Sequence, residues 1–163
     1  MLTYRAEPGL EEKVDGRGRS IAGYLEHHGR KLNSRFIPRC YELMLDDMDR
    51  NGVASVVISP AGPGAWYGEA AGARQICRAW NEYAATLKRD HGKRVGAFAL
   101  VAPPDVEGAL REIEYAIDTL KLDGVAFYTS YDRAYPGDEK YAPVWTELNR
   151  RKATVFFHPV ACC

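Results

Sequence analysis

The stretch VGAFALVAPPDVEGALREIEYAIDTLKLDGVAFYT, residues 95–129, contains the alternation that decides the fold. Two apolar runs, Val95–Val101 and Gly124–Thr129, enclose a segment whose apolar residues recur at helical spacing. Pro103 ends the first run, and Asp105 is placed to cap the helix that follows. The pattern predicts strand, helix, strand. A helix between two apolar strands is typical of a parallel sheet.

The same alternation continues on both sides of this stretch. Gly52 predicts the stop of a preceding helix, and the β-branched run after it predicts a strand buried on both faces. The expected order is helix–strand, four times over. The helices begin near Pro38, Ala73, Asp105 and Pro143, and the strands are Val53–Ser59, Val95–Val101, Gly124–Thr129 and Thr154–His158.

Two architectures fit four parallel strands joined by right-handed crossovers. One is an open doubly wound sheet, which 163 residues can complete. The other is part of a (β/α)8 barrel, which typically needs about 250 residues. Length alone favours the open sheet.

The first 37 residues differ from the rest of the chain. They are rich in glycine and scattered charges and show no sustained period of a helix or a strand. We expect an irregular N-terminal arm over residues 1–37, followed by one α/β domain over residues 38–163.

Composition limits the classes of partner. Lys+Arg is 22 and Asp+Glu is 22, so the formal net charge is zero, which argues against a nucleic acid or an anionic membrane as partner. No apolar stretch is long enough to span a membrane. The four cysteines show no C-x-x-C spacing, which indicates reduced thiols in a cytoplasmic protein.

Nucleotide and serine-hydrolase motifs are absent, so the histidines are the strongest chemical candidates. His158 stands at the carboxyl end of the last predicted strand, the end at which parallel α/β folds place binding groups. A metal or catalytic role and a buried structural role fit its position equally. His27 and His28 are adjacent and are expected in a solvated loop, and His91 is expected at a helix end.

The same edge of the predicted sheet carries four further candidates for a substrate pocket. Ser59 and Thr129 follow strands, whereas Trp66 and Tyr128 lie in or beside the segments at this edge. Aromatic side chains there either wall an apolar pocket or pack in the core. No catalytic acid or base is assigned from the sequence.

Several segments together resemble the amidohydrolase-related metal-dependent decarboxylases, and most closely the 6-methylsalicylate decarboxylase group. The resemblance covers about residues 38 to 159, and the segments that carry it are residues 48–53, 56–59, 62–64, 81–84, 96–99, 117–129, 143–152 and 155–159. It implies a (β/α)8 barrel with a divalent metal, zinc or manganese, at the carboxyl ends of its strands. His158 matches the family's metal-binding histidine on strand five.

The resemblance also implies that the chain is partial. It contains strands two to five of eight, no His-x-His pair is present, and the family's later histidine and aspartate would lie beyond Cys163. We therefore expect a truncated product that forms homo-oligomers or needs another chain to complete its barrel. The implied reaction is metal-dependent decarboxylation of a small aromatic acid. The alternatives are a metal-dependent hydrolase of the same superfamily and an inactive chain that serves in assembly.

Overall fold

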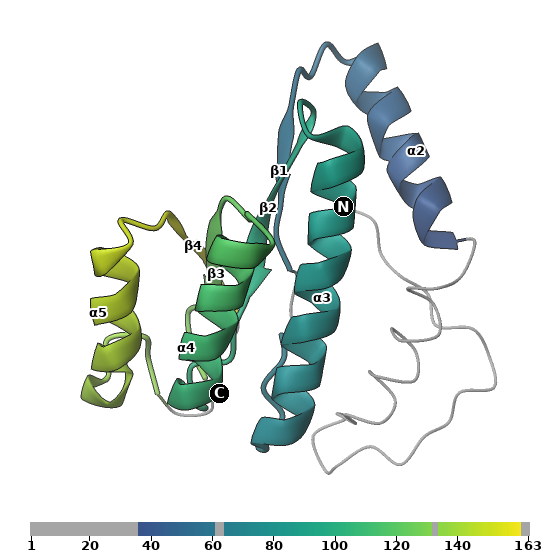
Figure 1. The fold of residues 1–163 in the computed structure, drawn as a ribbon. Helices are drawn as coiled ribbons and strands as arrows, with labels where there is room; N and C mark the ends of the chain where they lie inside the picture. Colours follow the sequence, from purple (N-terminus) through teal and green to yellow (C-terminus); the bar gives the residue numbers. More distant parts are fainter. Residues whose placement is uncertain (1–35, 61–63, 132–133, 161–163) are drawn as a thin grey trace, which may run out of the picture.

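The computed structural model describes residues 36–60, 64–131 and 134–160, and in them a four-stranded parallel sheet with helices between the strands (Figure 1). The expected N-terminal arm lies almost entirely outside the described residues. No described helix is both long enough and apolar enough to cross a membrane. The elements in chain order are α2 (Phe36–Arg50), β1 (Val56–Ile58), α3 (Ala70–His91), β2 (Val95–Leu100), α4 (Val106–Glu114), β3 (Gly124–Tyr128), α5 (Ala142–Arg150) and β4 (Val155–His158).

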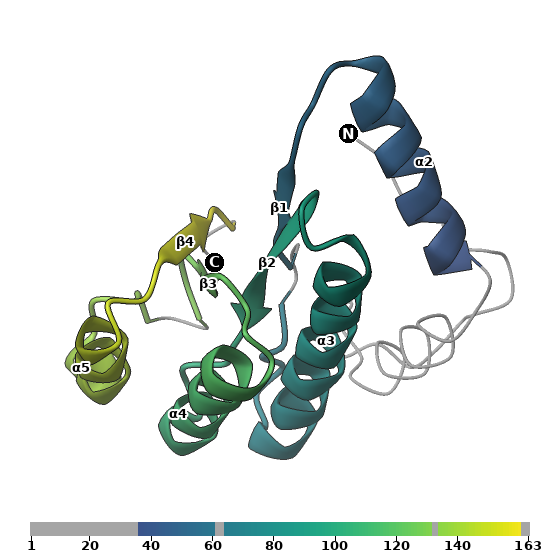
Figure 2. The same cartoon turned by 45° about the horizontal axis from the view of Figure 1, so that its top comes forward.

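The strand order is β1-β2-β3-β4, the same as the order along the chain. Because each right-handed crossover moves one strand further in the same direction, every connecting helix falls on the same side of the sheet. Figure 2 shows α3, α4 and α5 together on that side. A doubly wound sheet reverses direction and carries helices on both sides, so the architecture that length favoured is wrong. The sheet is a curled part of a (β/α) barrel.

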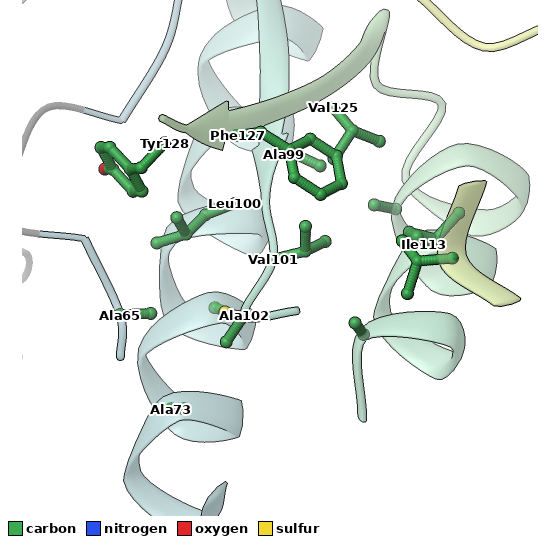
Figure 3. Packing of buried hydrophobic residues seen from close by; sticks show 14 of the residues in the cluster. Ala65, Ala73, Ala99, Leu100, Val101, Ala102, Ile113, Val125, Phe127 and Tyr128 are labelled. Atoms are coloured by element: carbon green, nitrogen blue, oxygen red, sulfur yellow. The ribbon is translucent and has the colours of Figure 1, made fainter. Parts of the chain in front are cut away.

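The helix-facing side of the sheet carries the core. Residues paired in register point to the same side, and Ala99 of β2 lies opposite Val125 of β3. These side chains belong to one cluster with buried residues of the helices, among them Ile76 of α3 and Ile113 of α4. Figure 3 shows Ile113 in this cluster. The cluster is dominated by alanine, valine and leucine, which lets the helices approach the strands closely.

Helix starts follow the expected chemistry. Asp105 caps α4, and its carboxylate accepts the Gly108 N–H at 3.1 Å. Arg74 of α3 binds the same carboxylate at 2.5 and 2.9 Å, and this guanidinium holds the pKa of Asp105 below its usual range. After Glu114 the helix continues as a π-helical turn, Tyr115–Thr119, before the chain enters β3.

The first strand differs from its prediction. The run Val53–Ser59 was expected to be buried on both faces, but only Val56–Ile58 forms a strand, and Val57 is 55% exposed. Two causes act together. In the described sheet β1 is an edge strand that pairs with β2 alone, and its Val57 points to the side away from the helices, where the described residues provide no second layer.

Candidate functional site

The carboxyl ends of the parallel strands meet at one edge of the sheet, here called the rim, which is formed by Ser59, Leu100, Tyr128 and His158 with the residues that follow them. Tyr128 and His158 lie directly opposite each other in the β3–β4 register. Their rings are 5.9 Å apart and meet edge to face at 61°. The structure therefore brings together two of the side chains that the sequence singled out.

His158 is half-buried, and one of its ring nitrogens has a backbone neighbour. Nδ1 lies 2.9 Å from the carbonyl oxygen of Pro159. With the proton on Nδ1, the ring donates to this carbonyl, and Nε2 then holds a lone pair. Metal-binding histidines are commonly oriented in this way, with the second ring nitrogen donating to a backbone carbonyl.

Among the described residues, His158 is a single candidate metal ligand here, and it does not form a complete site. Among residues 36–60, 64–131 and 134–160, no group of three or more His, Cys, Asp or Glu side chains is placed to hold a metal ion. A catalytic zinc site takes about three protein ligands. His158 thus fits a single coordination position, and no chemical step is derived through a metal.

Tyr128 is buried, with 3% of its surface exposed, and Gly64 lies against its ring. A Cβ on Gly64 would come 2.5 Å from Cε2 of this ring, and Gly64 has a φ of +83°, which L side chains rarely adopt. Glycine at this position lets the loop that leads to Trp66 approach the rim closely. Gly64 belongs to one of the segments that carry the family resemblance, but no sequence pattern predicted its contact with Tyr128, because the contact joins two distant segments.

Tyr131 is a second residue at the rim that the sequence did not single out as functional. Its hydroxyl oxygen accepts the backbone N–H of Tyr128 at 3.0 Å, and the two rings meet edge to face at 6.2 Å. Burial raises the pKa of Tyr131, so its hydroxyl stays protonated and neutral. Tyr131 therefore fixes the end of β3.

The hydroxyl of Thr129 ties the ends of β3 and β4 together. Its Oγ1 accepts the Val160 N–H at 3.0 Å and donates to the Val160 carbonyl at 3.3 Å. The backbone N–H of Thr129 donates to the His158 carbonyl at 3.2 Å. These bonds hold the segment that carries His158, so the observed contacts of Thr129 are structural.

Ser59 and Trp66 occupy other parts of the rim. Ser59 follows β1, at the opposite end of the strand order from His158. Trp66 is half-buried and packs against the core cluster. The structure therefore distributes the four predicted pocket residues along the rim and gathers only Tyr128 and Thr129 beside His158.

Comparison with known proteins agrees with this geometry. Residues 27–161 match the sequence profile of the family described as Amidohydrolase. The chain is 39% identical over 111 residues to 6-methylsalicylic acid decarboxylase acuB of Aspergillus aculeatus, a match that covers 66% of this chain and 34% of the relative. The chain spans about a third of the length of the curated relatives it matches.

Solved structures show the same arrangement of strands. The crystal structure of 5-carboxyvanillate decarboxylase LigW from Sphingomonas paucimobilis superposes with a TM-score of 0.69 at 27% identity, over 72% of this chain and 35% of that chain. A 5-carboxyvanillate decarboxylase from Novosphingobium aromaticivorans, solved with manganese, superposes with a TM-score of 0.68 over 79% of this chain and 35% of that chain. Its identity is 23%, and at that level the likeness shows the fold alone.

Proposed function

The chain belongs to the amidohydrolase family, and we propose from this membership that it takes part in the non-oxidative decarboxylation of a small aromatic carboxylic acid. The observation that carries the proposal is the identity of 39% over 111 residues to a 6-methylsalicylic acid decarboxylase. The substrate class that we propose is therefore a hydroxylated benzoic acid such as 6-methylsalicylate.

In this reaction the bond between the ring carbon and the carboxyl carbon breaks, CO2 leaves, and a proton takes its place on the ring carbon. We propose that the rim binds and orients the ring of the substrate, with Ser59, Trp66, Tyr128 and Thr129 along the wall of the pocket. The ring of Tyr128 lies edge to face beside His158, and aromatic side chains are typical of pockets that bind aromatic ligands.

His158 is proposed as one nitrogen ligand of a divalent metal ion, zinc or manganese. Such an ion would supply positive charge for the carboxylate or phenol oxygen of the substrate. The tautomer that leaves Nε2 with a lone pair supports this role. The remaining ligands would have to come from residues outside the described ranges or from a second chain.

The test is release of CO2 and of the decarboxylated phenol from 6-methylsalicylate by the purified chain, supplied with zinc or manganese. We expect His158→Ala to abolish release and His91→Ala to preserve it. His91 is a matched control because it ends α3 just before β2 begins, at the opposite edge of the sheet. Equal release from both variants, or none from the unmodified chain with either metal, would contradict the proposal.

A second candidate function is assembly, and the exposed apolar residues of the edge strands favour it. Val57 of β1 is 55% exposed, and Phe156 and Phe157 of β4 are 37% and 45% exposed. Unpaired strand edges with apolar side chains bind further strands readily. The proposed partner is a second copy of the chain. Sedimentation would then show an oligomer that persists in His158→Ala, and a monomer at every concentration would exclude it.

Two coarser points complete the proposal. The alternative function is that of a metal-dependent hydrolase of the same superfamily. The assay described above distinguishes the two reactions, because only decarboxylation releases CO2. We propose that the reaction takes place in the cytoplasm, because the four cysteines of the sequence show no C-x-x-C spacing and are expected to be reduced thiols.

A further inference from the structure

Strand β2 continues beyond its partner β1. The β1–β2 pairing ends at Ile58 and Ala97, whereas β2 runs on to Leu100 and stays paired with β3. Within one strand residue, the N–H and C=O groups point toward the same neighbouring strand. Those of Phe98 and Leu100 point toward the β1 side of β2, where the pairing with β1 has already ended. Polar backbone groups at such a position need other partners.

Two consecutive side chains of α3 supply these partners. The indole Nε1 of Trp80 donates to the Phe98 carbonyl at 3.2 Å. The amide of Asn81 contacts both groups of Leu100: Oδ1 accepts its N–H at 2.7 Å, and Nδ2 donates to its carbonyl at 3.0 Å. The amide of Asn81 thus makes the two hydrogen bonds that a neighbouring strand would make.

The amide of Asn81 is held in this orientation from behind. Asn81 is completely buried, and its Nδ2 also donates to Glu112 at 2.8 Å. Because a carboxylate only accepts, this contact places the nitrogen and not the oxygen toward Glu112. The guanidinium of Arg78 donates to the other carboxylate oxygen of Glu112 at 2.9 and 3.1 Å. The same guanidinium lies 3.7 Å from the centroid of the Tyr115 ring.

The consequence falls at the rim. The chain is free to leave the sheet after Ile58 and to form the loop whose Gly64 lies against Tyr128. Leu100 shares the sheet face of Tyr128, and its side chain points toward Tyr128 and Ala65 within one buried cluster (Figure 3). The hydrogen bonds from Asn81 to Leu100 therefore fix the position of the Leu100 side chain below the rim.

We propose that Asn81, assisted by Trp80, is a positioning residue that replaces β1 at the end of β2 and thereby fixes Leu100 beneath the proposed aromatic-acid site. The ligand in this statement rests on the function proposed above, whereas the placement of Leu100 does not. Asn81 touches no substrate, so its influence passes through Leu100.

Amide hydrogen exchange on the full chain tests the placement. In Asn81→Leu, which keeps the size of the side chain and removes both bonds, exchange at Leu100 is expected to accelerate at least ~30-fold more than at Val125. Val125 is the internal reference because its N–H donates to Thr154 in the sheet. The control Ile76→Val shortens a buried residue of the same helix and is expected to change both amides equally. Equal acceleration in Asn81→Leu would overturn the proposal.

A spectroscopic signature separates positioning from general stability. The ring resonances of Tyr128 should shift in Asn81→Leu and not in Ile76→Val. In Asn81→Asp, two carboxylates meet at the contact with Glu112, and the donor to the Leu100 carbonyl is lost. Adding Glu112→Gln restores a hydrogen bond at the first contact only, so the resonances should return part of the way. Unmoved resonances in Asn81→Leu would refute an influence on the rim.

Titration with 6-methylsalicylate connects the two proposals. If the unmodified chain binds it, Asn81→Leu should weaken binding at least ~10-fold while Ile76→Val leaves it unchanged. Equal binding would overturn the role of Asn81. If the unmodified chain does not bind 6-methylsalicylate, the proposed function fails for this ligand, and the exchange and ring signals alone decide the inference about Asn81.

Discussion

Phe127 and Phe157 lie on neighbouring strands in one aromatic cluster, and replacing each with alanine should have very different costs. Phe127 is 1% exposed and stacks on Trp145 with ring centroids 4.8 Å apart. Phe157 lies 6.0 Å from both rings and is 45% exposed. Phe127→Ala should lower the free energy of unfolding by about 3–5 kcal/mol. Phe157→Ala forfeits roughly half of a phenylalanine's burial, or about 1–1.5 kcal/mol.

Urea denaturation followed by circular dichroism measures both losses, at a low and a roughly 100-fold higher protein concentration. At the low concentration the two variants should differ by about 1.5–4 kcal/mol with the same urea dependence. If a second copy covers β4, the cost of Phe157→Ala should rise with concentration while that of Phe127→Ala changes little. Equal costs at the low concentration would refute the exposed position of Phe157 in the described sheet.

Three further predictions address the rim and the surface. Gly64→Ala should cost about 1–3 kcal/mol more than Gly68→Ala in thermal unfolding, since both glycines have positive φ but only a Cβ at residue 64 meets an aromatic ring; equal losses would contradict this. Two neighbouring arginines lower the pKa of Glu147 to about 2. Its stabilising contribution is therefore complete above pH 4.5 and disappears as the pH falls toward 2, so Glu147→Gln should flatten the stability curve in that window and nowhere else. His158→Ala should reduce the zinc or manganese retained after desalting, measured by elemental mass spectrometry, and unchanged metal content relative to His91→Ala would exclude a ligand role for His158.

The units with local signals could be predicted from the sequence. The stretch 95–129 folds as strand, helix and strand, and Asp105 caps its helix as expected, because a cap depends on residues only a few positions apart. The exposure of Val57 could not be predicted in the same way. A β-branched run is the same whether a second layer covers it or not, and the exposure of Val57 depends on how the sheet winds.

The winding itself shows a similar limit. Four alternating units are compatible with an open sheet or a barrel, and chain length pointed to the wrong one, whereas the family resemblance pointed to the barrel. At the rim, the meeting of Tyr128 and His158 follows from parallel strands ending at one edge. The contacts of Gly64 with Tyr128 and of Asn81 with Leu100 join distant segments, and no local pattern encodes them.

The agreement between strand order and chain order also has a consequence for folding. Each described strand pairs only with strands of adjacent units, so no pairing has to wait for a distant part of the chain. One connecting helix separates each pair of strands, as in Val56 with Val95 and Phe98 with Gly124, so each pairing closes a loop much shorter than the chain. A growing polypeptide can therefore lay down β2, α4 and β3 while β4 is still being synthesised, and each later unit docks on a template that is already formed.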